Sequence, residues 1–347
     1  MSGECERGKA GCDNESGITA YKKEGDMIRL MIAASTAVGA FLALPAAAQS
    51  YPAKTIRYVV PFTPAGATDI LARWVAEKLT PALGHSVVVE NRPGAAGGVG
   101  TELVAKSPPD GYTILMATAA QAVSETLYVR QPFSFARDLT AVALVARVPN
   151  VMEVHPSVPA KTVKEFIALA KSKPGQLNFA SSGAGTTLHM SGELFKLMTG
   201  VNIVHIPYKG SAPALNDLMA GQVSVMWDNL PASMPFIKAN RLRAIAITTA
   251  SRYPGLPELP TIAESGVPGY EASAWFGVVA PAGTPREIIT RLNTEINRAI
   301  NLPEMKERFA QQGATAAPGT PEEFGAWIRS EIAKWGKVVK ASGARVE

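Results

Sequence analysis

Residues 56–79 read IRYVVPFTPAGATDILARWVAEKL, and the period of the apolar residues changes along this stretch. The first part is a short β-branched and aromatic run that ends at Pro61, as a strand does. In the second part Leu71, Val75 and Leu79 recur at helical spacing. The stretch therefore predicts a strand, a tight loop and the beginning of a helix, which is the unit from which α/β domains are built.

The loop between this strand and this helix has the features of an anion site. Pro64 and Gly66 bend the loop, and Asp69 is predicted to cap the helix. The first amides of a helix carry about half an elementary charge, which favours a carboxylate or phosphate by about 0.3 to 1 kcal/mol. The alternative is an ordinary strand-to-helix turn, because most helix N-termini bind only water.

The composition is that of a folded, mildly basic protein. The chain has 347 residues, 47% of them hydrophobic, with a mean hydropathy of +0.08 and a formal net charge of +5. This is enough apolar sequence for one or two large cores. The Lys and Arg residues are scattered along the predicted helices rather than clustered, which argues against a nucleic-acid-binding surface.

The N-terminal region contains an export signal. A charged start at Met27 leads into an apolar run over residues 30–44 and then into small residues. A run of about fifteen apolar residues with these flanks defines a signal peptide and is too short to span a bilayer. We predict a signal peptide over 27–50, cleavage near Ala48 to Ser50 and a periplasmic mature chain.

Residues 1–26 do not fit a signal peptide, because an acid-rich extension ahead of the charged start is unusual. We predict that they are a mis-annotated upstream extension and that translation begins at Met27. Both cysteines, Cys5 and Cys12, lie in this extension. The mature chain then has no thiol, which excludes disulfides, cysteine catalysis and thiolate metal sites.

Beyond residue 50, short apolar strands alternate with amphipathic helices, as in parallel βαβ units. The predicted strands are at residues 58–60, 85–90, 112–117, 139–146, 151–154, 178–181, 204–207, 223–227, 243–248 and 273–280. Helix starts are predicted at Thr162, Thr284 and Thr320, where a hydroxyl precedes a carboxylate by three residues. Glycine or small polar residues follow the strands, which is typical of loops that line a cleft.

Two connections divide the chain. Residues 147–150 are predicted to carry it from a first domain into a second, and the strand at 273–280 to return it. The predicted organisation is a first lobe over 51–149, a second lobe over 150–272, and a return to the first lobe with C-terminal helices over 273–347.

Six loop motifs together resemble one protein family. They are PFTPAGATD at 61–69, ENRPG at 90–94, DGY at 110–112, SSGAGTTLH at 181–189, PYKG at 207–210 and WFGVVAPAGTP at 275–285. In this order and spacing they resemble the Bug, or TctC-like, family, the extracytoplasmic solute-binding receptors of tripartite tricarboxylate transporters. The resemblance covers the chain from Tyr51 to the C-terminus.

The resemblance implies an α/β fold of the type II periplasmic-binding-protein class, with two α/β lobes, a ligand cleft between them and two crossover strands. It also implies that loop amides and ordered waters bind a carboxylate as the lobes close. The ligand-binding residues implied by the motifs are Phe62, Pro64, Ala65, Gly66, Asp69 and Thr118 on one wall, and Ser181, Ser182, Gly183, Gly185, Thr186, His189, Tyr208, Lys209, Gly210 and Asp228 on the other.

The sequence departs from the family pattern at two places. Ala65 stands where the family usually has a glycine, and its methyl group narrows the backbone conformations open to the loop. Residues 119–122, AAQA, replace a stretch that in the family is often of the Gly-Thr-His-Ala type. The second difference leaves the distal part of the pocket, and with it the ligand, undetermined.

Several of these residues have a structural interpretation as well. Asp69 would repel a carboxylate, so we assign it to capping and to bracing its loop. Lys209 either pairs with the ligand or is solvated, and loop lysines are more often solvated. His189 is expected to brace its helix with a hydrogen bond. Trp227 and Trp275 either floor the cleft or lie in the core.

The sequence argues against an enzyme. It contains no G-x-S-x-G elbow, no His-Glu-x-x-His motif and no phosphate loop, and its histidines lack metal-ligand spacing. We therefore predict no catalytic residue, no metal and no cofactor. A serine hydrolase that pairs Ser181 or Ser182 with His189 is the minor alternative.

The expected function is that of a periplasmic receptor that captures a small carboxylate by lobe closure, for uptake through a membrane permease of the tripartite tricarboxylate type. The alternative partner is a membrane sensor, to which the ligand-loaded receptor would present the same carboxylate. We expect a monomer that binds a small organic acid and no nucleic acid. The sequence does not name the acid, because a site made largely of backbone amides accepts many.

Overall fold

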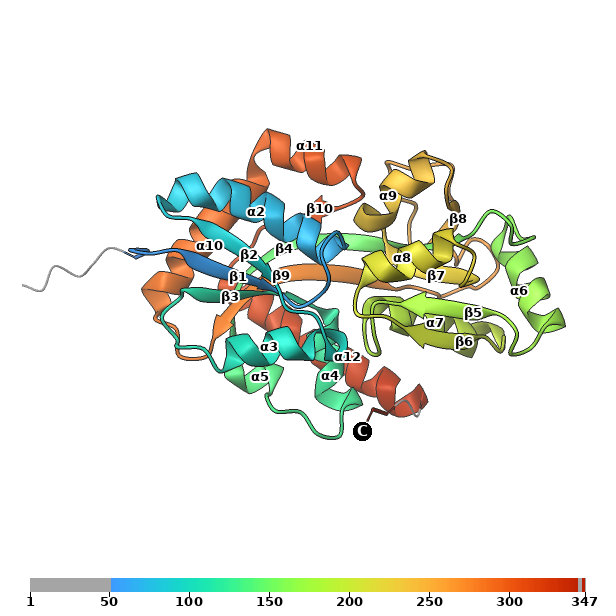
Figure 1. Ribbon diagram of the computed structural model, residues 1–347, viewed down its shortest axis with the longest axis horizontal. Coiled ribbons are helices and arrows are strands. Elements are labelled where there is room, and N and C mark those ends of the chain that lie inside the picture. The colour runs from blue at the N-terminus through green and yellow to red at the C-terminus, as the bar shows by residue number, and fades with distance from the viewer. Residues whose placement is uncertain (1–50, 343–344, 347) are drawn as a thin grey trace, which may run out of the picture. The chain divides into compact units, whose positions relative to one another are not determined.

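The computed structural model describes residues 51–342 and 345–346, along which strands and helices alternate (Figure 1). The predicted extension at 1–26 and the predicted signal peptide at 27–50 lie outside the described residues. Within the described residues, no helix is both long enough and apolar enough to cross a membrane.

Two long strands organise the chain. β4 (Leu139–Val154) and β9 (Ser273–Pro281) pair antiparallel as far as Pro149. From Asn150 onward β4 pairs with β7 (Val225–Asn229) instead. One strand therefore belongs to the sheets of two α/β lobes, which are built on its two halves.

The first lobe has the strand order β2-β1-β3-β9-β4, and the short strand β10 pairs with β4. Strands β1, β2 and β3 are parallel, whereas β9 runs antiparallel to both of its neighbours. The elements of this lobe are β1 (Ile56–Val60), α2 (Ala67–Leu83), β2 (Val87–Asn91), the 3-10 turn η1 (Ala95–Gly97), α3 (Gly98–Ala105), β3 (Thr113–Thr118), α4 (Ala119–Leu127), α5 (Phe135–Asp138), α10 (Arg286–Asn301), α11 (Pro303–Gln311), β10 (Thr315–Ala316) and α12 (Pro321–Ser342).

Alternation of side chains along β1 divides the core of the first lobe into two layers. Tyr58 and Val60 pack with α2, α10 and α11, whose apolar residues include Leu71. Val59 packs instead with α3, α4, α5 and α12, whose apolar residues include Val123 of α4. Figure 1 shows these two groups of helices on opposite sides of the sheet. Because both faces are covered, the strands of this sheet read as continuous apolar runs.

The second lobe has the strand order β4-β7-β5-β6, and β8 also pairs with β4. Its further elements are α6 (Val163–Ser172), β5 (Asn178–Ser181), α7 (Thr187–Thr199), β6 (Val204–Pro207), α8 (Ser211–Met219), α9 (Leu230–Lys238) and β8 (Arg243–Ile247). Phe166 of α6 and Phe195 of α7 pack with Phe179 and Trp227. Strands β5, β6 and β7 are parallel, so the loops after them meet at one edge of the sheet.

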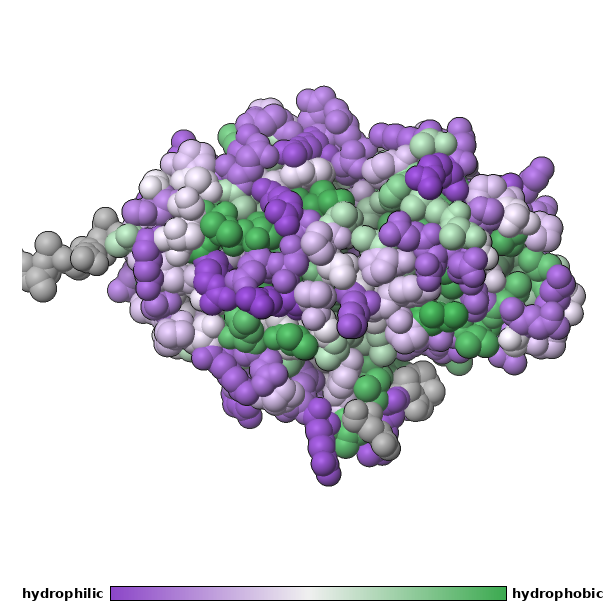
Figure 2. Space-filling model, viewed as in Figure 1, coloured by the Kyte–Doolittle hydropathy of each residue, from purple (hydrophilic) through white to green (hydrophobic). Residues whose placement is uncertain are grey.

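The surface is mostly polar on the face shown in Figure 2, where apolar patches are small and separated by polar residues. Val88 and Val204, among the exposed large apolar side chains, lie on β2 and β6, which end the strand order at its two sides. Most apolar side chains are thus used in the cores of the two lobes, as in other globular proteins.

Residues 139–146 and 151–154, predicted as two strands, form one strand, because β4 continues through residues 147–150. On one side Pro149 lies opposite Ser273 of β9. On its other side it lies between the end of the β10 pairing at Arg147 and the start of the β7 pairing at Asn150. A proline is tolerated there because no strand on that side requires its missing amide hydrogen.

Two helix starts also differ from the sequence-based expectation. Helix α9 is not among the predicted elements. Pro231 lies in its first turn, where a proline is tolerated, and Pro235 lies inside it, while Leu230 and Met234 pack into an apolar cluster. The N-cap of α10 is a proline, so Thr284 lies one residue before the cap instead of at it.

Candidate functional site

A small cavity lies where the carboxyl ends of strands from both lobes meet. It is lined by Phe62, Gly66, Ala67, Thr68, Thr118, Ser182, Thr186, Thr187, Leu188, Ser211, Asn229, Ala274 and Phe276. Its volume is about 20 Å³, which is room for about one water molecule. The free space between the two lobes is therefore narrow.

The N-termini of five helices surround this cavity. Helix α2 contributes Thr68, α4 its N-cap Thr118, α7 Thr187, α8 Ser211 and α9 its N-cap Asn229. Each N-terminus carries about half a positive charge. Their convergence favours an anion in the cavity, although no Lys or Arg side chain is among the residues that line it.

The caps of these helices leave backbone donors free. The N-caps of α2 and α8 are Gly66 and Gly210, which have no side chain to bond the first amides. The N-cap of α9, Asn229, also makes no capping bond with its side chain. In α4 and α7, by contrast, Thr118 and Thr186 cap their helices. Helices α2, α8 and α9 therefore offer the least satisfied amides to a bound anion.

Asp69 braces the loop between β1 and α2. Its side chain accepts hydrogen bonds from the Ala65 amide at 3.0 Å, Arg73 Nε at 2.9 Å and Asn91 Nδ2 at 2.9 Å. Burial acts to raise the pKa of Asp69, but these bonds outweigh burial and hold the pKa below its usual value. The predicted capping role is wrong, because Gly66 is the N-cap of α2. Asp69 ties the loop to β2.

Hydrogen bonds within the glycine-rich loop after β5 fix its shape. Thr186 Oγ1 donates to the Gly183 carbonyl at 2.7 Å, and the Ser181 hydroxyl accepts from the Gly183 amide at 3.1 Å. The Gly185 amide donates to His189 Nδ1 at 3.0 Å. His189 is therefore an acceptor for its own loop. Burial lowers the pKa of its imidazole, which favours the neutral ring that this bond requires.

The structure does not pair a serine with His189, as the hydrolase alternative requires. Ser181 is fully buried, and its hydroxyl lies 2.6 Å from His205 Nε2 instead. The rings of His205 and His189 stack with their centroids 4.0 Å apart. Burial, together with His189, lowers the pKa of His205 to about 3. Ser181, His189 and His205 do not line the cavity, whereas Ser182 does.

The two lobes are in contact around the cavity. A Cβ built on Gly183 would lie 3.1 Å from Ala96 Cα of the first lobe. A Cβ built on Gly185 would lie 2.7 Å from Leu127 Cδ2, also of the first lobe. The φ angles of Gly183 and Gly185, +129° and +88°, also favour glycine, so a side chain at either position would be strained and would press on the first lobe.

Of the residues implied by the family motifs, five line the cavity. They are Phe62, Gly66, Thr118, Ser182 and Thr186. The others do not: Pro64, Ala65, Asp69, Ser181, Gly183, Gly185, His189, Tyr208, Lys209, Gly210 and Asp228. Most of these residues fix the conformation of the loops or lie behind the residues that line the cavity.

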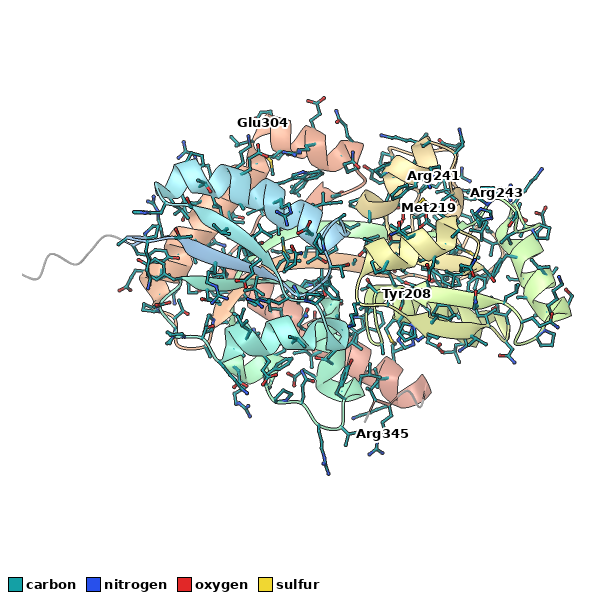
Figure 3. All side chains as sticks on the ribbon, viewed as in Figure 1. Tyr208, Met219, Arg241, Arg243, Glu304 and Arg345 are labelled. Carbon is teal, nitrogen blue, oxygen red and sulfur yellow. The ribbon has the colours of Figure 1, made fainter. Side chains whose placement is uncertain are left out.

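Three residues of the second lobe show why a motif residue need not line the cavity. Tyr208, labelled in Figure 3, lies on the loop after β6, and its hydroxyl donates to Asp217 at 2.5 Å. Lys209 next to it is exposed. Asp228 is fully buried and accepts a hydrogen bond from Ser211, which does line the cavity.

Sequence reasoning missed eight lining residues. They are Ala67, Thr68, Thr187, Leu188, Ser211, Asn229, Ala274 and Phe276. Four of the first five lie within the quoted motifs and Ser211 follows one directly; all five are first-turn helix residues, so the rule that helix N-termini bind anions would have found them. Ala274 and Phe276 lie on β9, where only the register decides which side chains face the cleft. Trp227 and Trp275 do not line the cavity and are buried in the core.

Among residues 51–342 and 345–346, no group of three or more His, Cys, Asp or Glu side chains is arranged to hold a metal ion. The cavity offers backbone amides, hydroxyls and two phenyl rings. Two α/β lobes with such a cavity between them define the type II periplasmic-binding-protein class of fold.

A family model described as "Tripartite tricarboxylate transporter family receptor" matches residues 71–344. The chain belongs to this family, the TctC or Bug family, as its loop motifs predicted. The members of this family are solute-binding receptors rather than enzymes.

Similar proteins cover nearly the whole described chain. Protein BugT of Bordetella pertussis is 42% identical over 308 residues, which is 88% of this chain and 94% of BugT. The structure of R. palustris Rpa4515 with adipate has a TM-score of 0.83 and 44% identity, over 85% of this chain and 100% of that one. MatC (Rpa3494) from Rhodopseudomonas palustris with bound malate has a TM-score of 0.80 and 30% identity, over 83% and 100%.

Proposed function

We propose that this chain is a periplasmic receptor that captures a small carboxylate by closure of its two lobes and delivers it to a membrane permease of the tripartite tricarboxylate type. The observation that carries the proposal is the convergence of five helix N-termini, from both lobes, on one cavity. Because each lobe contributes part of the wall, the complete set of donors exists only when the cleft is closed.

The carboxylate is recognised by neutral donors. The amides at the glycine-capped starts of α2 and α8 supply backbone donors. The hydroxyls of Thr68, Ser182 and Thr187 border the cavity and make no hydrogen bond within the described residues, so they are free to donate. Each hydrogen bond to a charged group contributes about 1.5 to 3 kcal/mol. A few such bonds replace the hydration of the anion.

The carbon skeleton of the acid lies against apolar side chains. Phe62 of the first lobe and Phe276 of β9 both line the cavity. Closure removes the bound acid from water, which strengthens each hydrogen bond in the lower local dielectric. A site with a few placed donors and apolar walls is the usual form of a small-molecule site.

The known relatives support a small organic acid as the ligand. The solved structures of Rpa4515 and MatC hold adipate and malate. The family description supports a tripartite permease as the partner. The alternative partner, a membrane sensor, would use the same closed cleft and stays a prediction.

The proposal is tested by thermal unfolding of the chain from Tyr51 onward, after unfolding and refolding to remove acid carried through purification. Adipate, malate, succinate and citrate are added singly, with adipamide as the uncharged control. A ligand at about one hundred times its dissociation constant adds about 2.7 kcal/mol to the folded state. We expect the midpoint to rise by several degrees with at least one acid and to be unchanged by the amide.

A variant of Lys209 tests whether the acid binds in the cavity or at this exposed side chain. Lys209→Ala is expected to leave the affinity within about twofold, because exposed lysines contribute little to ion pairing. A large loss of affinity would indicate that the anion binds at Lys209. Absence of any shift across the acids, with the stripped protein folded, would contradict the carboxylate-receptor function.

A further inference from the structure

Behind the cavity, a chain of hydrogen bonds runs from its wall into the core of the second lobe. Ser211 Oγ, on the wall, donates to Asp228 Oδ1 at 2.7 Å. Ser233 Oγ lies 3.1 Å from Asp228 Oδ2 and 2.6 Å from Glu153 Oε1. Asp228, Ser233 and Glu153 have no exposed surface, and Ser211 is 6% exposed.

The two carboxyl groups of this chain have different surroundings. Burial raises the pKa of Asp228 to about 6, but Asp228 accepts from two serine hydroxyls and from the backbone amide of Asn229, which oppose this rise and leave the carboxylate ionised at neutral pH. Glu153 contacts Ser233 alone, and its Oε2 has no partner among the described residues. Burial and the neighbouring Asp228 raise the pKa of Glu153 well above its usual value. Glu153 therefore keeps its proton.

The direction of each hydrogen bond follows from this assignment. Protonated Glu153 donates to Ser233 Oγ, and Ser233 donates its own hydrogen to Asp228. A hydroxyl has a single hydrogen, so Ser233 could not serve two ionised carboxylates at once. The ionised Asp228 has no hydrogen to give, so Ser211 must be the donor in the bond between them.

This order of donors determines the chemistry of the second-lobe wall. The hydrogen of Ser211 is used by Asp228, so its oxygen can only accept from the cavity. Asn229 is not limited in this way, because its Nδ2 group has two hydrogens and uses one of them for Asn150 Oδ1, at 2.6 Å. Ser211 is thus the side chain of this wall that presents an acceptor.

Acceptor oxygens are unfavourable neighbours for a carboxylate, which has no hydrogen to donate. They are favourable neighbours for a hydroxyl or an ammonium group. The free hydroxyls that can donate to the carboxylate, Thr68 and Thr187, start other helices of the same cavity. The cavity therefore has one region for a carboxylate and another for a hydrogen-bond donor.

We propose that Asp228 is a positioning residue for ligand specificity: its bond to Ser211 Oγ makes this wall an acceptor surface that selects acids with a hydroxyl or ammonium group beside the carboxylate. The inference rests on the proposed carboxylate-receptor function and names a ligand class for the same cavity. Of two acids with the same carbon chain, the acid that also has a hydroxyl group binds more tightly.

The test is calorimetric titration of the stripped protein with two matched pairs, succinate with malate and adipate with 2-hydroxyadipate. In at least one pair the wild-type protein is expected to prefer the hydroxylated acid by roughly tenfold, the effect of one well-placed hydrogen bond. In Asp228→Asn the amide group can donate to Ser211, whose hydrogen then turns to the cavity. The ratio of affinities in that pair falls to about one or reverses.

A second variant and a matched control keep the test independent of folding. Ser211→Ala removes the acceptor itself and is expected to lower the same ratio. Asp110→Asn makes the same chemical change at a half-exposed carboxylate that pairs with Lys54, and should leave the ratio unchanged. A general loss of stability does not move this ratio, because it affects both acids of a pair alike.

The outcomes separate this inference from the function on which it rests. Equal binding of both acids by the wild-type protein, or an unchanged ratio in both Asp228→Asn and Ser211→Ala, overturns the role of Asp228 and leaves the receptor function standing. If none of the four acids binds to the stripped, folded protein, and citrate does not bind either, the receptor function fails and the role of Asp228 fails with it.

Discussion

Ala65 holds a backbone conformation that is costly for an L residue. Its φ is 65°, in the left-handed region, where a side chain costs about 1 to 2 kcal/mol. The loop keeps this conformation because Asp69 binds the Ala65 amide at 3.0 Å. We expect Ala65→Gly to raise the free energy of unfolding by about 0.5 to 1 kcal/mol, since the greater freedom of glycine in the unfolded chain offsets part of the relief.

Urea unfolding checks this prediction against a control alanine. Ala333 is exposed within α12, where glycine is unfavourable. Ala333→Gly is expected to cost about 1 kcal/mol. If Ala65→Gly proved as destabilising as the control, left-handed strain at Ala65 would be refuted.

Asp69 links the stability of the same loop to pH. Because its folded pKa lies below its usual value, its bonds stabilise the protein above the unfolded pKa, and this stability is lost as the pH falls through the folded pKa. Asp69→Asn removes the charge. It is expected to cost about 1.5 to 3 kcal/mol near neutral pH, the contribution of hydrogen bonds to a charged group.

The measurement is urea unfolding of both proteins at a series of pH values from neutral into acid. The difference between them should shrink once the pH falls below the usual carboxyl range. A difference that stayed constant with pH would mean that the shape of the side chain, and not its charge, braces the loop.

At the scale of elements, a buried carboxylate attaches the last helix to a crossover strand. Glu331 Oε2 of α12 accepts from Trp275 Nε1 of β9 at 3.0 Å and from Trp335 Nε1 at 2.9 Å. Glu331→Ala would leave both buried indole groups without an acceptor, at a cost of about 2 to 5 kcal/mol. Glu331→Gln keeps a side-chain oxygen and should cost less.

Thermal unfolding distinguishes these two variants, because the alanine variant should have the clearly lower midpoint. Equal midpoints would show that the two indole groups do not depend on an acceptor at this position. Ligand affinity is the control readout, since Glu331 is not among the residues that line the cavity.

At the scale of the whole molecule, the proposed closure depends on glycines that meet the opposite lobe. Gly185 has a φ of +88° and lies against Leu127 and Val123 of the first lobe. Gly185→Val would place branched methyl groups in this contact. We expect the variant to fold, to bind its acid at least about tenfold more weakly, and to lose ligand-induced compaction in solution scattering, because the lobes cannot meet.

Gly200 provides the matched control for backbone strain. Its φ is +69°, and a Cβ built there would have nothing within 4 Å. Gly200→Val should therefore lose stability through the same left-handed strain, while keeping its affinity for the acid. Equal loss of affinity in both variants would count against closure at Gly185.

Local sequence determined the elements with strong periodicity or capping signals. The strands at 178–181 and 204–207 form as predicted, each as a short segment between turn residues. The box at Thr320 and Glu323 forms with reciprocal bonds of 2.8 and 3.1 Å. The motif set also identified the family, since its spacing spans both lobes.

The tertiary structure decided which side chains line the cavity. The family resemblance implies Asp69 and Asp228 as ligand-binding residues, yet Asp69 braces a loop and Asp228 is buried behind Ser211. Phe276 faces the cavity because the register of β9 against β3 and β4 places it there. Spacing along a chain sets local conformation, whereas the direction of a side chain toward a cleft depends on how distant strands pair.

The sequence by itself determined that this chain builds two α/β lobes with small polar loops at the strand ends, because period, capping and turn residues act over a few neighbours. Only the tertiary structure decided that five helix starts from both lobes share one cavity, and that Ser211 gives its hydrogen to the core. These features arise between residues far apart in sequence, where packing and burial, not local preference, determine the outcome.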